Sequence, residues 1–77
     1  MAQYRYIKDF YNRVIGSLED VGDEVIARDF YNKVLGYYRK KEDITQNFYR
    51  KVIGKGDLTS GLIWKAYNNR KNNGKTS

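Results

Sequence analysis

The sequence predicts an all-α fold, a small compact bundle of three to four short helices built from a repeated D/N-F-Y-x-R/K-V-I/L-G helix unit. Three observations lead to this prediction. The phrase DFYNRVIG at 9–16 recurs as DFYNKVLG at 29–36 and as NFYRKVIG at 47–54. Apolar residues in each copy recur at the spacing of one helix face, and strict alternation of apolar and polar residues is absent. The chain contains no proline, so that helix breaker interrupts no segment.

Each copy of the repeat places its apolar side chains along one stripe of the expected helix. In the second copy Ile26, Phe30, Val34 and Leu35 fall at positions i, i+4, i+8 and i+9. Residues at this spacing usually form a core, so the phenylalanine and the Val-Ile or Val-Leu pair of each copy are predicted to be buried. The tyrosines that follow the phenylalanines are expected at the border of this stripe, half covered. They are Tyr11, Tyr31 and Tyr49.

Helix boundaries are predicted from glycines and from capping residues. Each copy meets a glycine, the residue most often found just past a helix end, although the second of these glycines could lie inside a longer helix. Asp43 and Gln46 have the spacing of a capping box, and Asp57 precedes a fourth apolar stripe. The predicted helices span 3–18, 22–40, 43–53 and 57–70.

The length of the chain limits it to one domain. A chain of 77 residues buries only about 60% of its unfolded surface, so its core is small. There is no cysteine, so no disulfide can compensate for that small core. Residues 1–71 are predicted to form a single helical domain, and the polar segment 72–77 is predicted to be a flexible basic tail.

Charge is distributed unevenly between the two halves of the sequence. Residues 1–36 hold five basic and six acidic side chains, whereas residues 37–77 hold ten basic and three acidic ones. The net charges are therefore −1 and +7. A strongly basic half indicates a polyanionic partner, which is nucleic acid, an acidic protein surface or anionic lipid.

Several classes of function are disfavoured by the composition. Without histidine, a serine or threonine nucleophile lacks its usual base, so we expect no enzymatic activity, no small-molecule substrate and no cofactor. The acidic residues at 19, 20, 23 and 24 lack EF-hand spacing and are interpreted as helix-capping residues, so no metal is expected. No apolar run approaches the ~18 residues of a membrane span, so we expect no membrane partner and a cytoplasmic location.

The segment 43–71, DITQNFYRKVIGKGDLTSGLIWKAYNNRK, resembles a helix-turn-helix unit. In such a unit the second helix lies in the major groove, and residues near its N-terminus read bases. This resemblance places Thr59, Ser60 and Lys65 near bases, with other basic side chains on phosphates. The full set of candidate binding residues is Arg39, Lys40, Lys41, Arg50, Lys51, Lys55, Thr59, Ser60, Trp64, Lys65, Arg70 and Lys71.

Two functions follow from these observations. The first is a small regulator, not an enzyme, whose basic C-terminal half binds nucleic acid. The alternative is an adaptor or inhibitor that docks on an acidic surface of a larger protein through exposed Tyr, Trp, Lys and Arg side chains. Trp64 and Tyr67 are residue types that dominate the energetics of such interfaces.

Overall fold

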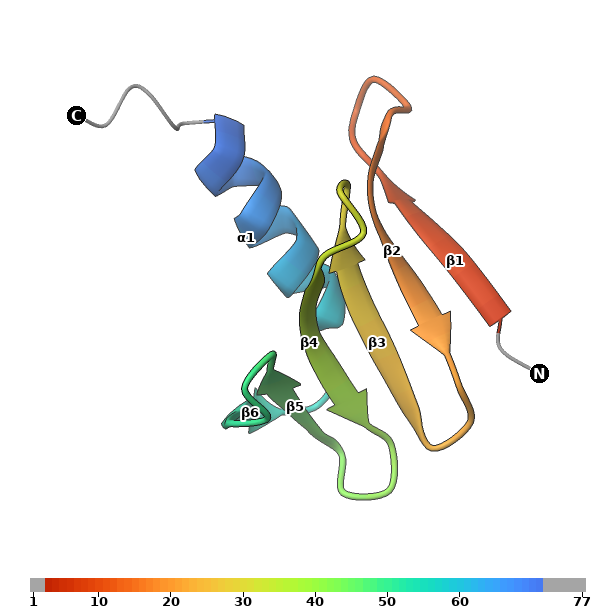
Figure 1. Ribbon diagram of the computed structural model, residues 1–77, viewed down its shortest axis with the longest axis vertical. Helices are drawn as coiled ribbons and strands as arrows, with labels where there is room; N and C mark the ends of the chain where they lie inside the picture. Colours follow the sequence, from red (N-terminus) through yellow and green to blue (C-terminus); the bar gives the residue numbers. More distant parts are fainter. Residues whose placement is uncertain (1–2, 72–77) are drawn as a thin grey trace.

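The computed structural model describes residues 3–71, and within them the protein is mostly β-structure. The all-α prediction is therefore wrong. The elements are β1 (Gln3–Lys8), β2 (Val14–Asp20), β3 (Glu24–Asp29), β4 (Val34–Arg39), β5 (Ile44–Asn47), β6 (Val52–Lys55) and α1 (Thr59–Lys71). The six strands form one sheet in the order of the sequence, and each strand is antiparallel to the next. The helix lies across one face of this sheet (Figure 1).

Three of the four predicted helices are β-hairpins. The segments 3–18, 22–40 and 43–53 correspond to the β1–β2, β3–β4 and β5–β6 pairs, and only the segment 57–70 is helical, as α1. The expected capping residue Asp43 lies in the β4–β5 turn with a φ of 56°. Residues 3–71, within the expected domain at 1–71, form a sheet with one helix rather than a set of helices. The predicted tail at 72–77 lies outside the described residues.

The repeated phrase encodes the turn of each hairpin rather than a helix. In the first copy, the Oδ1 atom of Asp9 accepts hydrogen bonds from the backbone amides of Tyr11 and Arg13. Asn12 then adopts a left-handed conformation, with a φ of 64°. Aspartate and asparagine favour this local pattern because their short side chains can bond to the backbone of the next residues. A tight turn followed by one left-handed residue is a common three-residue hairpin connection.

All three hairpins also share an irregularity just after the turn. The strand register shifts by one residue at the same place in each hairpin, leaving one aliphatic residue without a partner on the neighbouring strand. The unpaired residues are Ile15, Leu35 and Ile53. Such a bulge bends the strand and increases its twist. The repeat therefore specifies a whole hairpin: its turn, its bulge and the glycine that follows.

The glycines that close the first two copies face α1, and the glycine of the third copy faces the residue just before this helix. The facing pairs are Gly16 with Ile63, Gly36 with Leu62, and Gly54 with Leu58. A Cβ atom added at these glycines would lie 2.5, 2.6 and 2.7 Å, respectively, from a carbon of the facing side chain. At Gly16 and Gly36 the added atom would also meet a backbone carbonyl oxygen, of Arg28 and Gln46 respectively, whereas at Gly54 it would meet only the end of the Leu58 side chain. Gly16 and Gly36 are therefore docking positions for α1, and the interpretation of the three glycines as helix ends was wrong.

The core lies between α1 and the strands beneath it. It consists of Ile15, Leu18, Ala27 and Ile63, with Trp64 and other half-buried residues packed around it. The hydroxyl of Thr45 fixes the approach to the helix, since it accepts a hydrogen bond from the amide of Leu58 and donates one to the carbonyl of Gly56. Asp57 caps the helix as expected, by accepting a hydrogen bond from the amide of Thr59.

Candidate functional site

The three repeat turns lie side by side at one end of the strands, along the border of the sheet that runs across all six strands. Successive strands of the sheet alternate in direction, so the β1–β2, β3–β4 and β5–β6 turns all end at the same side (Figure 1). We call this side the aromatic edge and define it by residues 9–13, 29–33 and 47–51. Neighbouring turns are two strand spacings apart, or about 10 Å along the sheet. Each turn presents a phenylalanine followed by a tyrosine.

These aromatic side chains are exposed, contrary to the prediction that the phenylalanines form the core. Phe10, Phe30 and Phe48 are 95%, 56% and 50% exposed, and the adjacent tyrosines are 69–76% exposed. The turn geometry does not require aromatic residues, because it is fixed by the preceding aspartate or asparagine and by the left-handed residue. A cluster of exposed apolar side chains that the fold does not need is typical of a binding surface.

The first turn is tied to the helix. The Oδ2 atom of Asp9 accepts a 3.0 Å hydrogen bond from the hydroxyl of Tyr67 and forms an ion pair with Arg13. The Asp9 side chain is only 2% exposed. Burial raises the pKa of this carboxyl, but hydrogen bonds from the amides of Arg13 and Tyr11, from Tyr67 and from the Arg13 guanidinium outweigh it and hold the pKa at about 2. Phe10 packs loosely against Trp64, with 6.2 Å between ring centroids.

The second turn borders a hollow. The Oδ1 atom of Asp29 accepts hydrogen bonds from the amides of Tyr31 and Lys33, as in the first turn. Between this turn and α1 lies a hollow of about 210 Å³. Its walls are Ile15, Asp29, Phe30, Ala66 and Tyr67. An open recess with one carboxylate among apolar walls can receive a flat ring that carries a hydrogen-bond donor.

The third turn has asparagine in place of aspartate and keeps the same geometry. The Oδ1 atom of Asn47 accepts hydrogen bonds from the amides of Tyr49 and Lys51. The rings of Phe48 and Tyr49 lie close together, with 4.1 Å between their centroids. Arg50 takes the left-handed position, with a φ of 69°.

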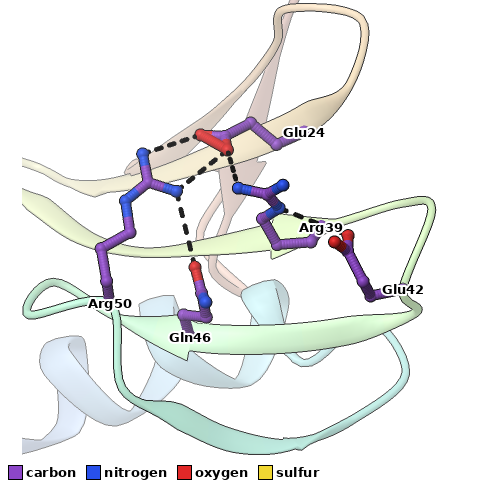
Figure 2. Close-up of polar contacts among 5 residues, drawn as sticks. All are labelled: Glu24, Arg39, Glu42, Gln46 and Arg50. Atoms are coloured by element: carbon purple, nitrogen blue, oxygen red, sulfur yellow. Dashed lines mark hydrogen bonds and ion pairs between the residues drawn. The ribbon is translucent and has the colours of Figure 1, made fainter.

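Arg50 is part of a charged network on the face of the sheet away from α1. Its guanidinium lies 3.7 Å above the ring of Tyr37 and bonds to both carboxylate oxygens of Glu24, at 3.0 and 3.1 Å. Figure 2 shows that Arg39 also approaches Glu24, while its Nε atom faces Glu42. The charges of these two arginines are thus partly neutralised by acids of the same molecule.

A second ion pair occupies the same open face, nearer to β1. Arg28 and Glu19 are 2.5 Å apart, and the hydroxyl of Tyr4 donates a hydrogen bond to the same carboxylate. The hydrogen bond from Arg28 is the main reason that the pKa of Glu19 is lowered. This face is therefore internally compensated in charge, which makes it a poor candidate for a polyanion site.

In the folded protein, the net charge differs between the two opposite edges of the sheet at which the turns lie. The aromatic edge holds four basic and two acidic residues, whereas the turns at 20–24 and 40–43, on the opposite edge, hold two basic and five acidic ones. Lys40 pairs with Asp20 at 2.8 Å on that opposite edge. Lys33 and Lys51 of the aromatic edge form no ion pair with any described side chain, those of residues 3–69.

The structure does not bring the sequence-predicted binding residues onto one surface. Arg39, Lys40, Lys41 and Lys55 lie toward the edge opposite the aromatic one, and Arg50 and Lys51 lie on the aromatic edge itself. Along α1, Ser60 and Lys65 are exposed and Trp64 is half-buried, while Arg70 and Lys71 are its last two residues. Thr59 is 1% exposed, so it cannot contact bases.

The helix-turn-helix expectation is wrong because its first helix is the β5–β6 hairpin. The residues that sequence reasoning missed are the three phenylalanines of the turns, which an apolar helical stripe assigned to the core. A different signal was present in the sequence. In the first two copies an Asp is followed three residues later by Asn, a pattern typical of a capped turn, whereas the third copy has Asn47 and Arg50 at these positions.

Two further properties bear on the range of possible sites. Among residues 3–71, no three metal-binding side chains lie together in a group that could hold an ion. The helix in that part of the chain is too short and too polar to cross a membrane. Comparison with protein-family models, curated proteins and solved structures finds no significant match.

Proposed function

We propose that this protein is a small, non-enzymatic binding protein that contacts nucleic acid through its aromatic edge. One observation carries the proposal. Three turns of the same geometry each present an exposed phenylalanine and tyrosine that the fold does not require. Aromatic faces of this kind stack on bases, and each stacked base contributes about 1–3 kcal/mol in known complexes.

The cations of the same edge supply the second part of the proposed contact. Arg13, Lys33 and Lys51 each follow an aromatic pair by two residues or fewer, and all three are exposed. Phosphates would lie beside these side chains while bases meet the rings. Binding of this type releases counterions and therefore weakens steeply as salt rises. The proposal places the protein in the cytoplasm, where nucleic acid is an abundant polyanion.

A second candidate function is docking on an acidic surface of a larger protein. The exposed phenylalanines favour it. Bases can stack on any aromatic ring, whereas a fully apolar ring at all three turns suits a buried protein interface. Phe10 is 95% exposed, and aromatic residues of this type are common anchors of protein interfaces. Such an interface would weaken much less with salt, because its buried core is poorly screened.

The test is fluorescence anisotropy of labelled mixed-sequence single strands and duplexes at 50 and 200 mM salt. Lys33→Glu with Lys51→Glu reverses two charges on the aromatic edge. Lys41→Glu with Lys55→Glu reverses two charges toward the opposite edge and serves as the matched control. The proposal expects wild-type binding that weakens steeply with salt, a large loss in the first variant and a small loss in the second. Flat anisotropy at 50 mM, or equal losses in the two variants, contradicts it.

A further inference from the structure

The aspartate that lines the hollow beside the second turn differs in its hydrogen bonding from the aspartate of the first turn. In both turns the Oδ1 atom of the aspartate is occupied by two backbone amides. At the first turn Oδ2 of Asp9 is also occupied, by Tyr67 and Arg13. At the second turn only Oδ1 of Asp29 is occupied, by two backbone amides, and Oδ2 accepts no hydrogen bond from the described side chains of residues 3–69. Asp29 therefore lines the hollow with an acceptor still available.

The remaining walls of the hollow suit a flat ring. Phe30 and Tyr67 supply aromatic surface, while Ile15 and Ala66 supply aliphatic surface. The volume of about 210 Å³ is several times the ~30 Å³ that one water occupies in the liquid. The hollow lies between the second turn and α1. Lys33 belongs to the same turn, and its backbone amide donates a hydrogen bond to Asp29.

From this arrangement we infer that the hollow is a base-selective site for single-stranded nucleic acid, an inference that rests on the proposed function. The ring of one base lies against Phe30, and its exocyclic amino group donates a hydrogen bond to Oδ2 of Asp29. Cytosine, adenine and guanine carry such an amino group, whereas thymine and uracil do not. The neighbouring phosphate faces Lys33.

The site requires a single strand because the base must enter the hollow. A base within a duplex is stacked on both faces and paired at its amino group, so it cannot enter a recess without being extruded. Unpaired bases can be splayed out onto aromatic side chains without that cost. A phosphate in place of the base is disfavoured, since the carboxylate of Asp29 would repel it.

The sharpest variant for this site is Asp29→Asn. The third turn already has asparagine at this position and keeps the turn geometry, so the substitution preserves the cap. It replaces the free acceptor with an amide donor, which matches the O4 acceptor of thymine instead of the amino group of cytosine. Asp23→Asn changes the net charge equally on the opposite edge and is the matched control.

The measurement is anisotropy with labelled 12-nucleotide single strands of all dC or all dT, together with the dC·dG duplex. Wild type should bind dC about tenfold more tightly than dT, as expected for one hydrogen bond to a charged acceptor. The duplex should bind more weakly than dC. Asp29→Asn should abolish or reverse the dC preference, and Asp23→Asn should retain it. Thermal unfolding of each variant checks that the fold is intact.

The remaining outcomes separate the two proposals. Equal binding of dC and dT by wild type, or a dC preference that survives Asp29→Asn, overturns the base-selective site but leaves nucleic-acid binding standing. Tighter binding of the duplex than of dC overturns the single-strand requirement in the same way. If the protein binds none of the three probes at 50 mM salt, the proposed function is wrong, and so is the base-selective site.

Discussion

The hydroxyl of Tyr67 donates a hydrogen bond to Oδ2 of Asp9, 58 residues earlier in the chain, and so joins α1 to the first turn of the aromatic edge. Asp9 thus serves two purposes: Oδ1 fixes the local turn, and Oδ2 anchors the helix. The edge proposed to bind nucleic acid is therefore connected to the core.

Tyr67→Phe should destabilise the protein by about 1 kcal/mol, because it removes one hydrogen bond to a nearly buried carboxylate while keeping the ring. Urea denaturation followed by Trp64 fluorescence measures the change. Tyr11→Phe makes the same chemical change at an exposed turn tyrosine and should leave the midpoint unaltered. Equal effects of the two substitutions would mean that the Tyr67 bond contributes nothing specific.

Stability should fall as the pH is lowered through the range set by Asp9. The carboxyl has a pKa of about 2 in the folded protein, against an ordinary value of 3.8, so its contribution is present above about pH 4 and is lost toward pH 2. Glu19 and Asp20 also have lowered pKa values and act in the same direction. Thermal unfolding at pH 7, 4 and 2.5 should show a smaller acid loss in Asp9→Asn than in wild type.

Two glycine-to-alanine substitutions should have opposite effects. At Gly16 a Cβ would lie 2.5 Å from Ile63 and 2.7 Å from the carbonyl oxygen of Arg28, so alanine should destabilise by about 1–3 kcal/mol. At Gly61, within α1, a Cβ meets nothing within 4 Å, so alanine should stabilise the helix by about 0.5 kcal/mol. Denaturation midpoints that moved in the same direction would contradict the assignment of Gly16 as a docking position.

Replacing Glu24 with glutamine should matter little for stability at moderate salt. Glu24 bonds to Arg39 and Arg50, whose side chains are 38% and 47% exposed, so solvent screens the pairs. We expect a change below about 1 kcal/mol, shrinking further in high salt. The same variant should strengthen nucleic-acid binding, because it frees the charge of Arg50 on the aromatic edge. Unchanged or weaker binding in the anisotropy assay would show that Arg50 faces away from the ligand.

Part of this fold could be predicted from the sequence. The helix at the C-terminal end was expected at 57–70 with Asp57 as its cap, and α1 spans Thr59–Lys71 with that cap in place. Local capping chemistry and the apolar stripe agree there, so the prediction held. The uneven distribution of charge was also visible in the sequence. Because the strands are antiparallel, the basic and acidic residues gather at opposite edges of the sheet rather than in the two halves of the chain.

The prediction of the other three segments failed because the same apolar spacing fits both a helix and a hairpin with a bulge. Phe10, Val14 and Ile15 match a helical stripe, yet Phe10 lies at the tip of a turn and Val14 begins a strand. The left-handed Asn12 makes a continuous helix impossible, and periodicity alone does not detect it. Whether the phenylalanine is buried depends on that turn, so the candidate site could be found only by giving the Asp-x-x-Asn turn signal priority over the apolar period.

The measurement that tests the central claim most directly is NMR mapping of the ¹⁵N-labelled protein during titration with a dC 12-mer. Because the chain has no proline, every residue after the first contributes a backbone amide to report on. The largest shift changes should fall in residues 9–13, 29–33 and 47–51, with small changes at 20–24 and 40–43. Changes centred on 40–43 and 55, or on the exposed face of α1, would contradict the proposed function.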